Sequence, residues 1–265
     1  MKSNHLIKKY NKLNSPLSIA LLADFHNSDP DPVLESLQQH APEVITVAGD
    51  FILGDMPEKK GLKIKENRRA IKLLRGCASL APTFVSLGNH EYMLCKADLK
   101  IIRETGVTLL DNRWASHRGL VIGGLSSTCC RIYRDFRAQH SGEGIYPEIP
   151  LRELRRKEPP QLDWLDEFEK QEGFKLLLCH HPEYYPLYLR ERKIDLIFSG
   201  HCHGGQWRFY SPLHRETIGL YAPGQGVFPK LTSGVHEGRL VISRGLSNTV
   251  FIPRINNPTE VVYIS

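Results

Sequence analysis

The chain has 265 residues, of which 41% are hydrophobic and 24% charged, and its formal net charge is +6. This composition excludes a disordered or fibrous protein, and no run of 18 or more apolar residues is present that would span a membrane. The positive charge suits an anionic substrate, nucleic acid or an acidic membrane surface without choosing among them. One domain over residues 1–265 is expected, because no linker rich in Pro, Ser or Gly divides the chain.

The N-terminal segment MKSNHLIKKYNKLNSP lacks the apolar core of a secretory signal. Leu6, Tyr10 and Leu13 would share one face of a helix that touches a membrane, but an edge strand leading to a core strand at Leu17 is favoured. The six cysteines form no C-x-x-C pair, which favours free thiols in a reducing compartment. We therefore expect a cytoplasmic protein, with peripheral contact with membrane lipid left open.

Short apolar runs alternate with helical patterns through the first two thirds of the chain. The expected strands are 17–23, 44–48, 83–87, 120–123, 174–179 and 196–199, and the expected helices are 32–39 with Asp31 as N-cap, 66–77, 97–105 closed by Gly106, and 161–171. GRLVISRG and EVVYIS add two strands near the C-terminus. Alternating strands and helices, followed mostly by strands, predict a layered α/β protein whose sheets are covered by helices.

Residues 126–160 break this rhythm and are treated as a basic insertion. The segment carries seven cations: Arg131, Arg134, Arg137, Arg152, Arg155, Arg156 and Lys157. Arginine suits phosphate recognition, so the insertion is a candidate for contacting the substrate. It also contains acidic residues, among them Asp135, Glu143, Glu148 and Glu153, so a solvated loop is an equally good interpretation.

Five apolar strands each run into polar groups that can bind a metal. These groups are Asp24-Phe25-His26, Asp50, Asn89-His90-Glu91, His180-His181 and His201-Cys202-His203. In open α/β sheets the ligand crevice lies beyond the carboxyl ends of the strands. One such group alone is commonly a turn or helix cap, but five together predict a metal site. Alternate residues of an extended segment point the same way, so D-x-H and H-x-H should each present two side chains.

These blocks, in this order, resemble the calcineurin-like metallophosphoesterases. The pattern of that family is D-x-H, G-D, G-N-H-[DE], a lone H and G-H-x-H, and all five blocks occur between residues 24 and 203. SGHCHGGQW is similar to a bacterial branch of small phosphodiesterases and of relatives that act on lipid-linked substrates. The resemblance implies a four-layer α/β/β/α sandwich of two mixed β-sheets flanked by helices, with two bound metal ions.

The resemblance also implies a role for each matched residue. Asp24, His26, Asp50 and His203 would hold the first metal, and Asn89, His180 and His201 would complete the second, with Asp50 as the bridge. His90 matches the histidine that is not a ligand and lies beside the scissile phosphate. Many relatives have a second Asp soon after the Gly-Asp block, whereas Asp55 comes later in this chain. We therefore expect Asp55 to lie in a loop or to contact the metal ligands without binding a metal itself.

Three more residues are candidates for contacting the substrate, each with an alternative. His181 could face the substrate, take the ligand position in place of His180, or only form a hydrogen bond. Tyr92 follows the Asn89 block and could line the pocket. Arg244 could contact phosphate or form a structural salt bridge.

Two cations about 3.5–4 Å apart suit phosphate ester hydrolysis, because they hold both the attacking and the leaving oxygen and activate a hydroxide. A ligand set of nitrogen and oxygen without thiolate favours Mn, Fe or Zn. The leading hypothesis is therefore a phosphodiesterase for a small or lipid-linked phosphodiester or pyrophosphate. A nuclease, a phosphomonoesterase such as a protein phosphatase, and a non-catalytic module remain as alternatives. Nucleic acid is not favoured, since aromatic and basic residues are not interleaved.

Overall fold

The first of two large sheets is built from both ends of the chain. The computed structural model describes residues 6–11, 13–54, 64–144, 146–154, 157–212, 216–248 and 253–265. The six strands lie in the order β1 (Leu6–Tyr10), β16 (Glu260–Ile264), β2 (Ile19–Leu22), β3 (Val44–Ala48), β4 (Thr83–Ser86) and β5 (Thr108–Leu109). β16 runs parallel to β1 and antiparallel to β2, and β2 to β5 are parallel, so the sheet is mixed.

The second sheet also has six strands with a parallel centre. Their order is β14 (Gly234–His236), β15 (Leu240–Ile242), β9 (Leu196–Ser199), β8 (Phe174–Cys179), β7 (Leu120–Leu125) and β6 (Arg113–His117). The edge strands β14 and β6 are antiparallel to their neighbours, whereas β15, β9, β8 and β7 are parallel. β2, β3, β4, β7 and β9 are buried along their whole length, as expected for strands covered on both faces.

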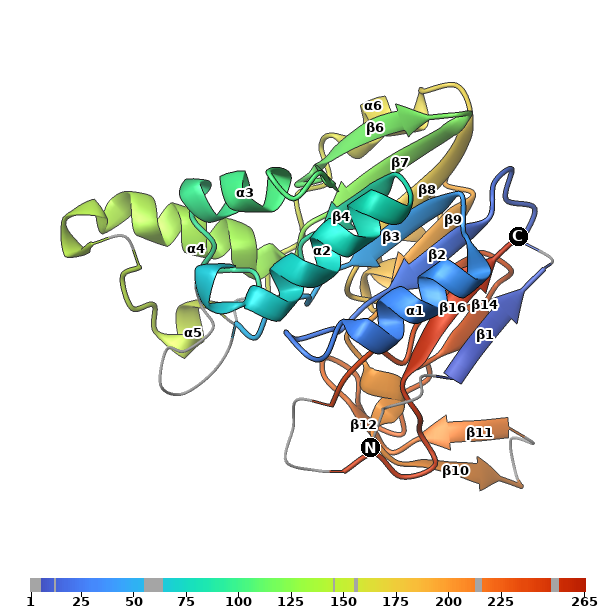
Figure 1. Ribbon diagram of the computed structural model, residues 1–265. Coiled ribbons are helices and arrows are strands. Elements are labelled where there is room, and N and C mark those ends of the chain that lie inside the picture. Colours follow the sequence, from blue (N-terminus) through green and yellow to red (C-terminus); the bar gives the residue numbers. More distant parts are fainter. Residues whose placement is uncertain are drawn as a thin grey trace.

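The two sheets pack face to face, and helices cover their outer faces (Figure 1). Leu21, Phe84, Ile122, Phe198 and Val262 belong to the apolar layer between the sheets. On the first sheet lie α1 (Asp31–His40), α2 (Arg68–Leu80) and α3 (Lys96–Arg103). On the second lie α6 (Leu165–Glu169) and the π-helical turn η3 (Tyr185–Leu189). The expected four-layer α/β/β/α sandwich is confirmed.

Several elements differ from expectation at their ends. β1 is an edge strand, as favoured over a helix. Asp31 is the first residue of α1 and Pro30 is its N-cap, so the assignment of Asp31 as N-cap is wrong. α6 is shorter than the expected 161–171, and α3 ends before Gly106, which adopts the left-handed φ of 95°. The six cysteines are free, as expected.

The basic insertion contains regular structure, so the expectation of a break over residues 126–160 is wrong. α4 (Thr128–Gln139), η2 (Ser141–Glu143) and α5 (Leu151–Leu154) follow β7. Ile132 and Tyr133 are buried on one side of α4, which gives the helix a packed face. Some of its arginines form close ion pairs, since Arg131 lies 2.6 Å from Glu158 and Arg134 lies 2.8 Å from Asp111.

Smaller elements complete the described chain. η1 (Ile64–Glu66) precedes α2, and η4 (His203–Gly205) follows β9. Two short hairpins then form, β10 (Arg208–Ser211) with β11 (Glu216–Gly219), and β12 (Tyr221–Ala222) with β13 (Gly226–Val227). Within the described residues, no helix is both long and apolar enough to cross a bilayer. A cytoplasmic location stays a prediction.

Candidate metal centre

The predicted ligands meet where the carboxyl ends of strands from both sheets lie next to each other. Asp24 and Asp50 follow β2 and β3 of the first sheet, and Asn89 follows β4. His180 and His201 follow β8 and β9 of the second sheet. The parallel strands of each sheet point their carboxyl ends at this edge, so residues far apart in sequence become neighbours.

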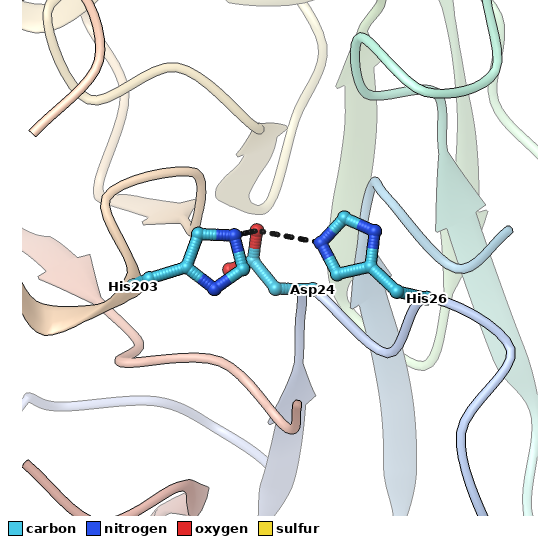
Figure 2. Close-up of side chains that lie close together, drawn as sticks. All are labelled: Asp24, His26 and His203. Atoms are coloured by element: carbon cyan, nitrogen blue, oxygen red, sulfur yellow. Dashed lines mark ion pairs between the residues drawn. The ribbon is translucent and has the colours of Figure 1, made fainter. Parts of the chain in front are cut away.

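One group of donors consists of Asp24, His26 and His203 (Figure 2). Nε2 of His26 and Nε2 of His203 lie 3.8 Å and 3.6 Å from Oδ1 of Asp24, and all three donor atoms lie within 4.8 Å of one another. The two imidazole rings are stacked, with centroids 5.2 Å apart. The carboxylate therefore faces a ring nitrogen on each side, at distances that leave room for a cation between the donors.

A second group consists of Asp50, His180 and His201. Nδ1 of His180 is 2.7 Å from the carbonyl oxygen of Ala48, which turns Nε2 of His180 towards Oδ2 of Asp50 at 2.9 Å. Asp50 also groups with His26 and His90, and Nε2 of His90 lies 3.8 Å from Oδ2 of Asp50. Asp50 thus faces both donor groups, which is the position expected of a bridging carboxylate.

Unsatisfied buried atoms test whether these residues fit metal ions. Both ring nitrogens of His26, Nδ1 of His90 and Oδ1 of Asn89 are buried and have no hydrogen-bond partner. Buried polar atoms in proteins are normally paired, because an orphan loses its hydration without replacement. Imidazole nitrogens and carboxylate or amide oxygens are also ligands that Mn, Fe and Zn accept. The residues present therefore fit such metal ions.

The ligand segments are left-handed turns, so the expectation of extended D-x-H and H-x-H segments is wrong. Asp24, His26, Asp50, His201 and His203 have φ between 45° and 69°. This region is uncommon for residues other than glycine, although Asp and His are enriched there. Such turns bring the paired side chains to one region without the alternation of a strand. Strained backbone of this kind is found preferentially at functional sites.

Two glycines allow the backbone to come this close to the carboxylates. A Cβ on Gly88 would lie 2.2 Å from Oδ1 of Asp50, and a Cβ on Gly200 would lie 2.6 Å from Oδ2 of Asp24. Both distances are far below van der Waals contact. A side chain at either position would displace a predicted ligand.

Glu91 connects two of the turns that carry predicted ligands, although the sequence pattern gave it no separate role. Its buried carboxylate accepts backbone N–H groups from Gly88 at 2.7 Å, Asp50 at 2.9 Å and Ile52 at 3.1 Å. Burial and the neighbouring Asp50 raise the pKa of Glu91 to about 8. One side chain therefore joins the turn that carries Asp50 to the turn that carries Asn89 and His90.

The electrostatics of the centre follow from burial and from its two carboxylates. Burial lowers the pKa of His26 and of His201 well below the usual range, which keeps these rings neutral. Burial alone would also lower the pKa of His180, but Asp50 and Asp24 more than offset this and raise it to about 10. Burial would raise the pKa of Asp50, yet His180 and His90 hold it well below its usual range. Asp50 is therefore an anion at neutral pH.

The three candidate substrate contacts have different surroundings. Nδ1 of His181 is 3.0 Å from Oε1 of Glu183, and the His181 ring lies 4.2 Å from the ring of His201, so His180 rather than His181 takes the position facing Asp50. The half-buried Tyr92 packs edge-on against Tyr133 of α4. Nε of Arg244 lies 3.4 Å from Oε2 of the buried Glu260. Asp55 lies outside the described residues.

A second arginine, Arg254, lies at the centre and was not singled out from the sequence. Its Nη2 is 3.0 Å from Nδ1 of His203 and donates to the carbonyl oxygen of Ser247 at 2.6 Å. Nε and Nη1 are buried without a hydrogen-bond partner. Burial lowers the pKa of Arg254 to about 10, so it still carries its charge at neutral pH. The motif PRINNP contains no spacing that would have indicated this position.

Known proteins resemble this chain over most of its length. The model of the family "Calcineurin-like phosphoesterase" matches residues 17–205. YpbG of Bacillus subtilis is 31% identical over 199 residues, which cover 73% of this chain and 64% of YpbG. Phosphodiesterase YaeI of Escherichia coli is 26% identical and covers 80% of this chain and 72% of YaeI. The UDP-2,3-diacylglucosamine pyrophosphatase LpxG of Chlamydia muridarum is 25% identical, and the alignment covers 97% of this chain and 85% of LpxG.

This chain thus spans slightly less than two thirds of YpbG, and a larger share of YaeI and LpxG. The family model covers all five blocks of polar residues that end the strands. The chain belongs to the calcineurin-like phosphoesterase family.

Proposed function

We propose that this protein is a dinuclear metal-dependent phosphodiesterase that hydrolyses a small or lipid-linked phosphodiester or pyrophosphate. The observation that carries the proposal is that Asp50 belongs to two donor groups, one with His26 and His90 and the other with His180 and His201. Family membership supports hydrolysis of a phosphoric ester. The names of YaeI, a phosphodiesterase, and LpxG, a pyrophosphatase, favour a diester or pyrophosphate over a monoester.

In this proposal each predicted ligand keeps the role expected from the sequence. Asp24, His26 and His203 hold the first ion, Asn89, His180 and His201 hold the second, and Asp50 joins the two. When bound, such ions polarise the phosphoryl group and supply a nucleophile at neutral pH. The neutral rings of His26 and His201 support this, because imidazole binds a metal only through a free lone pair.

The other side chains would bind and orient the anionic substrate. His90 has a partly exposed side chain and an unpaired Nδ1, so it is suited to donate a hydrogen bond to a phosphoryl oxygen or a proton to the leaving group. Arg254 adds a fixed positive charge beside His203 and has two unpaired nitrogens. A guanidinium matches the geometry of a phosphate or a carboxylate group, so Arg254 is suited to bind a phosphate oxygen.

A hydrolysis panel tests the proposal. Protein reconstituted with Mn, Fe or Zn is assayed on a bis-aryl phosphate, an aryl monophosphate, cyclic nucleotides, single-stranded DNA and a nucleotide-sugar lipid. The diester or the lipid pyrophosphate should be cleaved fastest, and both chelation and Asp50→Ala should abolish turnover. Asp31→Ala is the matched control, because this carboxylate is exposed and pairs only with Lys72 at the surface among the described residues. Activity that survives chelation would refute the metal mechanism, and preference for DNA would support the nuclease alternative.

A further inference from the structure

An exposed aromatic surface lies beside the metal centre and has no role in the proposed hydrolysis. We call it the aromatic lobe, and it comprises residues 207–212, 216–228 and 253–255, which include β10 to β13. The lobe projects from one end of the sandwich (Figure 1). Its exposed large hydrophobic side chains are Trp207, Phe209, Tyr210, Tyr221, Val227, Phe228 and Ile255. Contiguous apolar surface of this kind on a soluble protein marks an interaction site.

The exposed residues of the lobe are neighbours. Phe209 and Phe228 stack edge to face, with ring centroids 6.2 Å apart. Tyr221 pairs with Val227 across the β12–β13 hairpin, and the N–H of Phe228 donates to the carbonyl oxygen of Leu220 at 2.9 Å. The N–H of Leu220 in turn donates to the carbonyl oxygen of Trp207 at 2.9 Å. The aromatic rings therefore stand on one hydrogen-bonded framework.

Phe228 indicates that this exposure is not incidental. Its φ is 54°, a left-handed conformation that is unfavourable for a bulky residue, and 60% of its surface is exposed. Burial of the ring inside the folded protein therefore does not offset the strain. Backbone strain that is not compensated by packing in the core indicates that the residue has a function, such as binding a partner, rather than a role in folding.

The lobe is fixed rigidly to the segment that carries His203. Gly205 and Gly219 are so close that a Cβ on Gly205 would lie 2.6 Å from the Cα of Gly219. The N–H of Leu220 also lies 3.1 Å from the carbonyl oxygen of Gly205. Nδ2 of Asn257 donates to the carbonyl oxygen of His203 at 2.6 Å. Whatever the lobe binds is consequently held at a fixed orientation to the metal centre.

The chemistry of the lobe favours an anionic lipid surface. Between His203 and Glu237 the sequence has one acidic residue, Glu216, against the cations Arg208, Arg215 and Lys230, of which Arg208 is buried and donates to the carbonyl oxygens of Gly204 and Thr217. Among the described residues, Lys230 is exposed at the lobe. Trp and Tyr, with an apolar body and a polar tip, are enriched where proteins meet the headgroup region of a membrane. An exposed basic residue such as Lys230 next to such rings adds attraction to anionic lipids.

We propose that the aromatic lobe docks on an anionic bilayer and presents the metal centre to phosphate groups at the membrane surface. The choice of a membrane as partner rests in part on the proposed function, because the phosphate of a lipid-linked substrate lies at the membrane surface. The rigid connection from Phe228 through Leu220 and Gly205 to His203 sets the distance between the bilayer and the centre. Docking would need no movement of the sandwich.

Vesicle flotation tests the proposal on the whole chain without substrate. Vesicles of phosphatidylcholine with a quarter phosphatidylglycerol should carry the protein, and those of phosphatidylcholine alone should carry less. Phe209→Ser combined with Phe228→Ser should lower the partition coefficient more than about tenfold. Leu151→Ser is the matched control, since Leu151 is equally exposed on α5, away from the lobe (Figure 1). It should float like the original protein.

Phe228→Gly gives a second variant that removes the ring and also relieves the left-handed φ, so it should not harm folding. It too should bind vesicles more weakly, with an unchanged circular dichroism spectrum. Equal flotation of the original protein and both lobe variants would overturn the proposal. So would absent flotation together with a dimer, seen by light scattering, that the lobe variants dissociate. Because flotation is scored without turnover, inactivity with intact flotation would refute only the proposed function.

Discussion

Replacing Glu91 tests whether one buried carboxylate holds the two turns of the metal centre. Glu91→Ala leaves the N–H groups of Gly88, Asp50 and Ile52 without their acceptor in a site closed to water. Each buried donor that loses its partner costs about 1–3 kcal/mol. Allowing for relaxation and for the removal of a buried carboxylate, we expect a loss of roughly 3–6 kcal/mol in the free energy of unfolding.

Urea unfolding of the metal-free protein measures this loss without a contribution from metal binding. Glu43→Ala is the matched control, because Glu43 also accepts a backbone N–H, from Ser18 at 2.9 Å, but at the surface beside Arg118. It should cost less than about 1 kcal/mol. Metal content after reconstitution should fall in Glu91→Ala and not in Glu43→Ala. A Glu91 variant within 1 kcal/mol of the original protein, with full metal content, would refute the reasoning.

Three further predictions concern the centre. His90→Ala should lower kcat about 10²–10⁴-fold with metal retained, as measured by kinetics and elemental analysis; loss of metal would instead make His90 a ligand. Arg254→Met should raise KM for an anionic diester about tenfold or more, partly rescued in Arg254→Lys, and an unchanged KM would rule out phosphate contact. Metal affinity should rise about tenfold per pH unit from about pH 7 to 10, because His180, whose pKa is raised to about 10, must release a proton when it binds the metal. Calorimetry of metal binding in two buffers of different ionisation enthalpy measures the number of protons released.

The same raised pKa has a consequence for the metal-free protein. Because folding raises the pKa of His180 from 6.5 to about 10, its pairing with Asp50 stabilises the fold fully below about pH 6.5. That contribution fades as pH rises through about 10. Metal-free protein should therefore unfold more readily at pH 10 than at pH 7, and a bound metal should remove this dependence.

The strands and the meeting of the ligands could be predicted because both depend on local patterns. Continuous apolar runs such as Leu176–Leu178 can only be satisfied by burial on both faces, and parallel strands necessarily end at one edge. The polar residues directly after those runs were therefore bound to be neighbours. That residues 1–265 form one domain stays a prediction.

The remaining features depend on contacts between distant residues. The left-handed turns at Asp24 and His203 are stabilised by contacts with the surrounding protein. A positive φ cannot be predicted from the presence of an Asp or a His alone. Arg254 reaches His203 from 51 positions away, through a segment with no pattern of its own. α4 was missed because its many charges hide a narrow apolar face, on which Ile132 and Tyr133 are buried.

The position of β16 between β1 and β2 bears on how the protein is synthesised. β1 joins the first sheet through pairing with β16, whose residues 260–264 come far later in the sequence than residues 6–10 of β1. On the ribosome, which adds about 5–20 residues per second, β1 must wait more than ten seconds for this partner. Until then the edge of β2 that β16 later covers is open to other strands, including those of neighbouring nascent chains.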